Sequence, residues 1–126
     1  MVAGVDYIVS IMPHTPQSEN MLNKTLFDAM QPSALLLNVG RGSAVVDADL
    51  IEALEDGKLA GGILDVFREE PLPAEHPFWT TKNLTITPHT SAPSLPIDVV
   101  PIFHDNYLRL VAGKSLNYLI NFEKGY

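Results

Sequence analysis

The sequence predicts an α/β fold on a parallel sheet, of the size of half a doubly wound domain. Short apolar segments rich in β-branched residues recur along the chain, segments with helical spacing of apolar residues separate them, and prolines or glycines end most of them. Strands that alternate with helices in this way form β-α-β units with parallel strands. Four strands make a small sheet for this class, so we expect an apolar edge strand without a partner.

Three elements are predicted in the first part of the chain. Residues 5–12 form a strand, because β-branched and aromatic side chains dominate them and Pro13 follows. Asn23 is placed to cap a helix over residues 24–30, whose apolar side chains share one face. Residues 34–38 form the second strand, and their continuous apolar character is that of a strand covered by helices on both faces.

A glycine turn at residues 40–42 leads into the next β-α-β unit. Asp47 is expected to cap a helix that runs through Asp56 and stops at Gly57, which would take the left-handed conformation. A third strand covers residues 61–65.

The last part of the chain holds one more strand and one more helix. After a proline-rich loop, residues 84–87 form a short strand that closes at Pro88. A helix lies within residues 97–111, and Pro101 belongs near its first turn, since proline deeper in a helix costs about 3 kcal/mol. We expect a boundary between residues 1–93 and a terminal helix and tail, residues 94–126.

Composition narrows the functional classes. The 126 residues suffice for one compact domain, and a hydrophobic fraction of 46% supports a buried core. The net charge of -7 argues against binding to nucleic acid or anionic membranes. The chain has no cysteine, which excludes disulfides and thiolate chemistry, and its apolar runs are too short to span a bilayer. We therefore expect a soluble, cytoplasmic protein.

The residues that follow each strand are the candidates for chemistry, because ligands of open parallel sheets bind beyond the carboxyl ends of the strands. Arg41 stands between two glycines, which would let a ligand approach the backbone while the guanidinium binds a carboxylate through two parallel hydrogen bonds. A small oxyacid fits that description. The alternative is a surface arginine in a glycine turn.

His89 follows the fourth strand and could act as a general acid, with Glu70 raising its pKa and fixing its tautomer. The alternative is a histidine with a structural role. Asp65 could pair with Glu70 as acid and base, or could cap a turn. The other histidines, for which the sequence shows no partner, are interpreted as structural: His14, His76 and His104.

Other common sites lack their patterns in this sequence. Gly40 and Gly42 do not open a G-x-G-x-x-G fingerprint, because Val45 stands where the third glycine belongs. Spacings typical of metal ligands are absent, as is a G-x-S-x-G turn. We predict no metal site.

At these residues the chain resembles the D-isomer-specific 2-hydroxyacid dehydrogenases, over Val5 to about Ala92. The segments that carry the resemblance are residues 12–16 (MPHTP), 38–42 (NVGRG) with Val46, Asp47 and Leu50, 61–67 (GGILDVF), 70–73 (EPLP), 77–79 (PFW) and 87–89 (TPH). The resemblance implies the C-terminal half of a Rossmann-type domain that binds NAD or NADP. Within the family, residues 84–89 and the terminal Gly125 and Tyr126 look most like the glyoxylate/hydroxypyruvate reductase A group.

The resemblance also implies roles for single residues in the reduction of a small 2-oxoacid. Arg41 would bind the substrate carboxylate and carbonyl oxygen, His89 would donate the proton, and Glu70 would hydrogen-bond His89. Asp65 would contact the nicotinamide end of the cofactor. The cofactor would also be lined by Met12, Pro13, Val39, Gly40, Arg41, His89, Ser91 and Ala92.

Two departures from the family bear on this expectation. The glycine-rich loop of the family is missing, and Pro93 and Pro96 interrupt the stretch after His89. A non-catalytic fragment or interaction module that keeps the remnant of the fold is the alternative function. We also expect a homo-oligomer, such as a dimer, because self-association would bury the sheet edge and the last helix.

Overall fold

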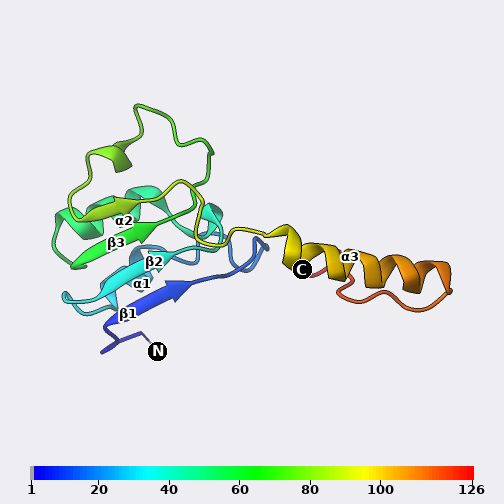
Figure 1. Cartoon of the computed structure of the whole chain (residues 1–126). Helices are drawn as coiled ribbons and strands as arrows, with labels where there is room; N and C mark the ends of the chain where they lie inside the picture. Colours follow the sequence, from blue (N-terminus) through cyan, green and yellow to red (C-terminus); the bar gives the residue numbers. More distant parts are fainter. Residues whose placement is uncertain (1) are drawn as a thin grey trace. The chain divides into compact units, whose positions relative to one another are not determined.

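The computed structural model describes residues 2–126 and contains one sheet of four parallel strands. The strands are β1 (Tyr7–Ser10), β2 (Leu35–Asn38), β3 (Gly61–Leu64) and β4 (Leu84–Ile86). They pair in the order of the chain, β1-β2-β3-β4, as Figure 1 shows. The predicted α/β fold with a parallel sheet is therefore confirmed. All four strands are shorter than the sequence predicted, because pairing ends before the apolar pattern does.

Two helices cover one face of this sheet (Figure 1). They are α1 (Lys24–Asp28) and α2 (Asp47–Glu55). Their apolar sides meet the buried side chains of β2 and β3, and the largest fully buried apolar side chains are Phe27, Leu36, Val45, Leu50, Leu59, Leu64 and Val66. Burying such side chains contributes about 1.5–3 kcal/mol each, so this layer supplies most of the stability of the sheet.

The opposite face of the sheet is open within the unit formed by residues 2–91. Leu35 and Leu37 are only half-buried, and Tyr7 and Val9 of β1 are 65% and 56% exposed. The expectation of helices on both faces of β2 is thus wrong for this unit. The continuous apolar pattern of residues 34–38 arises from burial on one face and partial exposure on the other.

The residues that cap the helices agree only in part with the sequence prediction. Asn23 caps α1 as predicted, accepting a hydrogen bond from the Leu26 amide at 3.3 Å. Helix α2 begins differently: Val46 is its N-cap, without a side-chain bond, and Asp47 is its first residue. The predicted Asp47 cap is therefore wrong, although an acid in the first turn still favours the helix dipole. Gly57 ends α2 with a φ of +68°, as predicted.

Between the strands lie two short 3-10 helices, η1 (Gly42–Ala44) and η2 (Pro77–Trp79). The first occupies the predicted glycine turn and starts directly after Arg41. The second lies in the proline-rich loop between β3 and β4. Both belong to the loops at the carboxyl ends of the strands.

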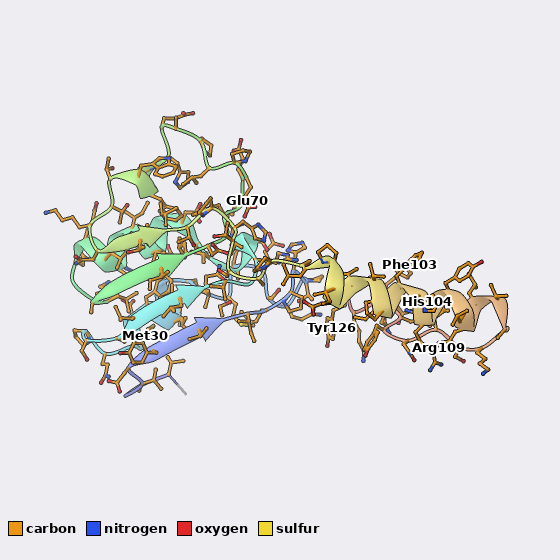
Figure 2. The ribbon with its side chains drawn as sticks, in the orientation of Figure 1. Met30, Glu70, Phe103, His104, Arg109 and Tyr126 are labelled. Atoms are coloured by element: carbon orange, nitrogen blue, oxygen red, sulfur yellow. The ribbon has the colours of Figure 1, made fainter. Side chains whose placement is uncertain are left out.

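A second compact unit begins at Ala92, and it contains α3 (Pro96–Val111). Pro101 is the sixth residue of α3, one turn deeper than expected, so the Ile97 carbonyl loses its helical donor there. None of the helix residues is buried, and Figure 2 shows the labelled Phe103 and His104 projecting from it. After α3 the chain folds back, and Asn117 exchanges two hydrogen bonds with Asn106.

Within residues 2–126, no helix has the length and apolar character needed to cross a membrane.

Candidate active site at the carboxyl ends of the strands

His89 and Glu70 form a direct pair at the end of the sheet. The Nδ1 atom of His89 lies 2.7 Å from Oε2 of Glu70, and the other carboxylate oxygen accepts a hydrogen bond from the Phe67 amide at 2.8 Å. These two bonds hold the pKa of Glu70 below its usual range, and the bond from His89 has the larger effect. The positive charge of Arg41 lowers the pKa of Glu70 further. An ionised carboxylate only accepts hydrogen bonds, so Nδ1 carries a proton and Nε2 is left to act on a ligand.

His89 adopts a left-handed backbone conformation, with a φ of +54°. This conformation is uncommon for residues other than glycine and needs support from its surroundings. Its imidazole is about half exposed, so the ring can be reached from solution while Glu70 fixes one edge of it. The predicted link between the two residues is present in the structure.

Asp65 supports the loop that carries His89. Its carboxylate is 1% exposed and accepts hydrogen bonds from the Thr90 amide at 3.0 Å, the Ser91 amide at 2.9 Å and the Thr87 hydroxyl. Burial opposes ionisation, but hydrogen bonds from Ser91, Thr87 and Thr90 outweigh it and hold the pKa of Asp65 well below its usual range. The carboxylate therefore holds the Thr87 side chain before His89 and the backbone amides after it, and it does not contact Glu70 in the manner of an acid and base pair.

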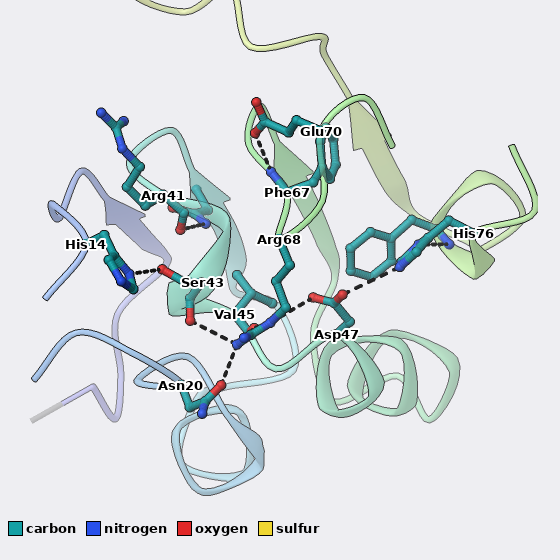
Figure 3. A network of polar contacts seen from close by, with 12 residues as sticks. His14, Asn20, Arg41, Ser43, Val45, Asp47, Phe67, Arg68, Glu70 and His76 are labelled. Carbon is teal, nitrogen blue, oxygen red and sulfur yellow. Dashed lines mark hydrogen bonds and ion pairs between the residues drawn. The ribbon is translucent and has the colours of Figure 1, made fainter. Parts of the chain in front are cut away.

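Arg41 begins the loop after β2. Its side chain is exposed, and Nη1 donates to the carbonyl of Gly40 at 2.7 Å. Figure 3 shows the guanidinium turned away from the other polar contacts of this region. The charge of Arg41 also acts on Glu70, the partner of His89, so the Arg41 side chain lies toward the edge of the sheet that carries His89. The guanidinium has donors to spare for an anionic ligand.

The two glycines beside Arg41 pack against the chain itself. A Cβ atom on Gly40 would lie 2.7 Å from backbone atoms of Met12, and one on Gly42 would lie 1.9 Å from the carbonyl carbon of Phe67. The expectation that the glycines make room for a ligand is thus wrong at both positions. They allow the ends of β1, β2 and β3 to come into backbone contact.

The remaining predicted positions are distributed as follows. Met12 and Val39 are half-buried, Pro13 is exposed, and the Ser91 amide is engaged by Asp65. Ala92 opens the second unit.

Two of the histidines interpreted as structural have partners that the sequence did not reveal. Nδ1 of His14 lies 2.7 Å from the hydroxyl of Ser43. His76 accepts a hydrogen bond from the Phe78 amide at 3.2 Å and lies 3.5 Å from Asp47. Burial raises the pKa of Asp47, although the charges of Arg68 and His76 oppose this effect. His104 is exposed on α3.

A cavity of about 500 Å³ adjoins the His89 and Glu70 pair, and no sequence pattern indicated it. It is lined by Phe67, Glu70, Pro71, Leu72, Trp79, Ile86, Pro88 and His89. These residues come from the segment after β3, from η2, from β4 and from the loop that follows β4, and these parts meet only in the folded chain. Among residues 2–126, no three histidine or carboxylate side chains converge in a way that could hold a metal ion.

Comparison with known proteins identifies the family. The NAD binding domain of the D-isomer specific 2-hydroxyacid dehydrogenases matches residues 1–91. The chain belongs to this family. The resemblance drawn from residues 12–16, 38–42 and 61–89 is therefore confirmed, as is the Rossmann-type fold.

The relatives of this domain include proteins named glyoxylate/hydroxypyruvate reductase and other 2-hydroxyacid dehydrogenases. The glyoxylate/hydroxypyruvate reductase A of Serratia proteamaculans is 42% identical over 123 residues, which are 98% of this chain and 39% of that protein. A family member from Aeromonas salmonicida is 46% identical with a TM-score of 0.90, over 96% of this chain and 39% of its own. The NADPH-dependent glyoxylate/hydroxypyruvate reductase of Sinorhizobium meliloti, solved with NADP and sulfate, is 32% identical with a TM-score of 0.92, over 99% of this chain and 41% of its own.

The chain thus spans about two fifths of the length of the relatives it matches. It corresponds to part of the NAD binding domain of a dehydrogenase family, and the Sinorhizobium relative was solved with NADP.

Proposed function

We propose that this chain carries the catalytic residues for the NAD(P)-dependent reduction of a small 2-oxoacid, such as glyoxylate or hydroxypyruvate. The observation that carries the proposal is the 2.7 Å contact between His89 and Glu70, which leaves Nε2 of the imidazole available, while the charge of Arg41 acts on the same Glu70. A proton donor and a fixed cation are the groups that a carbonyl needs as it gains negative charge.

The residues at the strand ends fit the nicotinamide end of the cofactor. Gly40 packs directly on the Met12 backbone, so that the ends of β1 and β2, with Pro13 and Val39, form one continuous surface. We assign the nicotinamide contacts to these residues, to Arg41, Asp65 and His89, and to Ser91 and Ala92. The glycine-rich turn that would bind the pyrophosphate is absent from the 126 residues.

In this mechanism Arg41 binds the carboxylate of the 2-oxoacid and holds the carbonyl oxygen toward His89. NADH or NADPH, when bound, would supply a hydride with its two electrons to the carbonyl carbon. His89 gives the proton from Nε2 to the carbonyl oxygen, and the product is the 2-hydroxyacid. Glu70 keeps the imidazole oriented for this transfer. A non-catalytic module would not require this pair, and no observation favours that alternative.

The residence and assembly of the whole protein also belong to the proposal. We place it in the cytoplasm, in keeping with the absence of cysteine. We also propose a homo-oligomer, such as a dimer, because the exposed side chains of β1 and α3 are largely apolar.

A chimaera tests the function directly. In it, this chain replaces the matched 39% of the Serratia reductase. The chimaera should reduce glyoxylate or hydroxypyruvate with NADPH. In Arg41→Lys the KM for the oxoacid should rise and kcat should fall, because lysine lacks the planar fork that matches a carboxylate. A folded chimaera that binds NADPH but reduces neither acid would contradict the proposal. Equal reduction of a 2-oxoacid and its carboxamide would remove Arg41 from carboxylate binding.

A further inference from the structure

Arg68, two residues before Glu70, joins the loops that follow three strands. Its Nε atom donates to the Val45 carbonyl at 2.8 Å, and Nη2 donates to the Ser43 carbonyl at 2.9 Å. Nη2 also bonds the side-chain oxygen of Asn20, and Asp47 lies 3.9 Å from Nε (Figure 3). Asn20 belongs to the loop after β1, Ser43 and Val45 to the loop after β2, and Arg68 itself to the loop after β3.

Arg68 binds carbonyl groups at the C-terminal end of η1, the short helix that begins directly after Arg41. Helix termini leave carbonyl groups without helical partners, and arginine side chains can satisfy them. Ser43 is two residues beyond Arg41, and its carbonyl also accepts from the Asn20 amide at 3.0 Å. Arg68 therefore ties down the C-terminal end of η1, whose other end carries the Arg41 side chain.

The backbone of Phe67, next to Arg68, links η1 to the pair formed by Glu70 and His89. Gly42 packs on the Phe67 carbonyl so closely that a Cβ atom there would lie 1.9 Å from its carbon. The Phe67 amide donates to Glu70 at 2.8 Å, and Glu70 in turn binds His89 at 2.7 Å. A continuous set of contacts thus connects η1 to the imidazole through residues 67–70.

We propose that Arg68 is a positioning residue that sets the place of Arg41 relative to His89. The proposal rests on the reductase function proposed above. Arginine suits this task because its planar group offers five donors in a rigid fork and stays charged, so one side chain serves two carbonyl groups and an amide oxygen together. Lysine at this position could hold one or two of these acceptors.

Amide hydrogen exchange on the 126-residue chain tests the contact without any activity. The Ala44 and Val45 amides close η1 on the carbonyls of Arg41 and Gly42, at 3.2 and 3.0 Å. In Arg68→Met their exchange should speed up about tenfold, because charged hydrogen bonds to η1 are lost. Glu69→Gln, at the exposed neighbouring position, is the matched control and should leave both rates unchanged. Unchanged rates in Arg68→Met would overturn the proposal.

Kinetics of the chimaera test the positioning role. Arg68→Met should lower kcat/KM for the oxoacid by about 10- to 100-fold, mainly through KM, since small displacements of a binding group have effects of this size. The Kd for NADPH should not change, and Arg68→Lys should restore part of the loss. An Arg68→Met chimaera with the parent kcat/KM, or with NADPH affinity lost in parallel, would overturn the positioning role. If the chimaera with Arg68 intact is inactive, the proposed function fails, whereas the exchange rates still decide whether Arg68 holds η1.

Discussion

At the scale of single residues, the site depends on the state of one imidazole. Glu70 accepts the Nδ1 proton of His89, so the second nitrogen is the one that can exchange a proton with a ligand. The backbone of His89 lies in the left-handed region. Asp65 supports that conformation by accepting hydrogen bonds from the Thr90 and Ser91 amides of the same loop. Two carboxylates thus act on one histidine, one through the ring and one through the main chain.

Substitution of the imidazole should separate catalysis from cofactor binding. In the chimaera, His89→Asn should lower kcat by about 10²- to 10⁴-fold, because proton donation contributes that much to such reactions. The Kd for NADPH, measured by fluorescence, should stay within about twofold, since the change is confined to the exposed ring. A variant with nearly the parent kcat would remove His89 from the role of acid.

Asp65 should make the stability of the chain depend on pH. Its pKa in the folded chain is held well below that of the unfolded chain, which is about 3.9. Its contribution is therefore complete above the unfolded pKa and is lost as the pH falls from about 5 toward the folded pKa. Asp65→Asn should lower the free energy of unfolding at pH 7 by about 1.5–3 kcal/mol and flatten its decline in acid.

Urea unfolding between pH 3 and pH 7 measures both effects of Asp65→Asn. Glu55→Gln, at an exposed position of α2, is the control and should change neither value. An Asp65→Asn chain with the parent decline in acid would show that this carboxylate does not hold the loop.

At the scale of elements, close backbone packing holds the loops together. Gly42→Ala would place a methyl group 1.9 Å from the Phe67 carbonyl carbon, so η1 would have to move. We expect a loss of about 1–3 kcal/mol in the free energy of unfolding, as overpacked sites show. Gly57→Ala is the comparison: its φ of +68° costs about 1–2 kcal/mol, but nothing lies within 4 Å of the new atom.

The two glycine variants differ in what they do to the site. Chemical shifts of the Arg41 amide should change in Gly42→Ala and stay constant in Gly57→Ala. The same shift in both variants would mean that Gly42 is not a specific contact between η1 and Phe67.

Local signals in the sequence predicted those elements whose causes are local. Asn23 caps α1 and Gly57 ends α2 because each acts on its own turn of helix. The cap at Asp47 was wrong: Val46 is the N-cap, and the Asp47 carboxylate lies near Arg68 and His76, which are distant in sequence. Pro101 lies deeper in α3 than expected: the helix already begins at Pro96, so Pro101 is its sixth residue and falls in the second turn.

The same distinction between local and distant causes applies to the candidate site. That Arg41, Glu70 and His89 follow different strands is visible in the sequence, and parallel strands bring such positions to one edge. The 2.7 Å contact of Glu70 with His89 agrees with the suggestion from the residues that a nearby carboxylate could fix the tautomer of His89, and with the hydrogen bond that the family resemblance implied. The bonds from Asp65 to Thr90 and from Arg68 to Ser43 had no sequence signal, because these loops meet only after the sheet has formed.

At the scale of the whole molecule, each of the two units leaves apolar side chains in solvent. In the first unit Tyr7, Val9 and Ile11 are more than half exposed, and in the second Ile97 and Phe103 are more than 70% exposed. Surfaces of this kind promote association. We expect the 126-residue chain to self-associate at micromolar concentration, which light scattering would measure. Charged substitutions at Val9 and Phe103 should lower the measured mass.

The same chain should bind dinucleotides weakly, because the backbone amides of a glycine-rich turn are not among its residues. Calorimetry with NADH and NADPH should give dissociation constants well above micromolar. Micromolar binding by a stable monomer would contradict both this expectation and that of self-association.

The order of the strands in the sheet has a consequence for how the molecule assembles. Since every strand pairs with its neighbour in the chain, a growing chain can add each strand to the sheet as soon as it is made, without waiting for a distant partner. Such an arrangement keeps loop closures shorter than they would be if neighbouring strands were distant in the chain. Arg68 reaches η1 only after β3 is in place, and the loop of His89 closes on Asp65 after β4. Assembly in this order builds the sheet first and completes the reactive groups last.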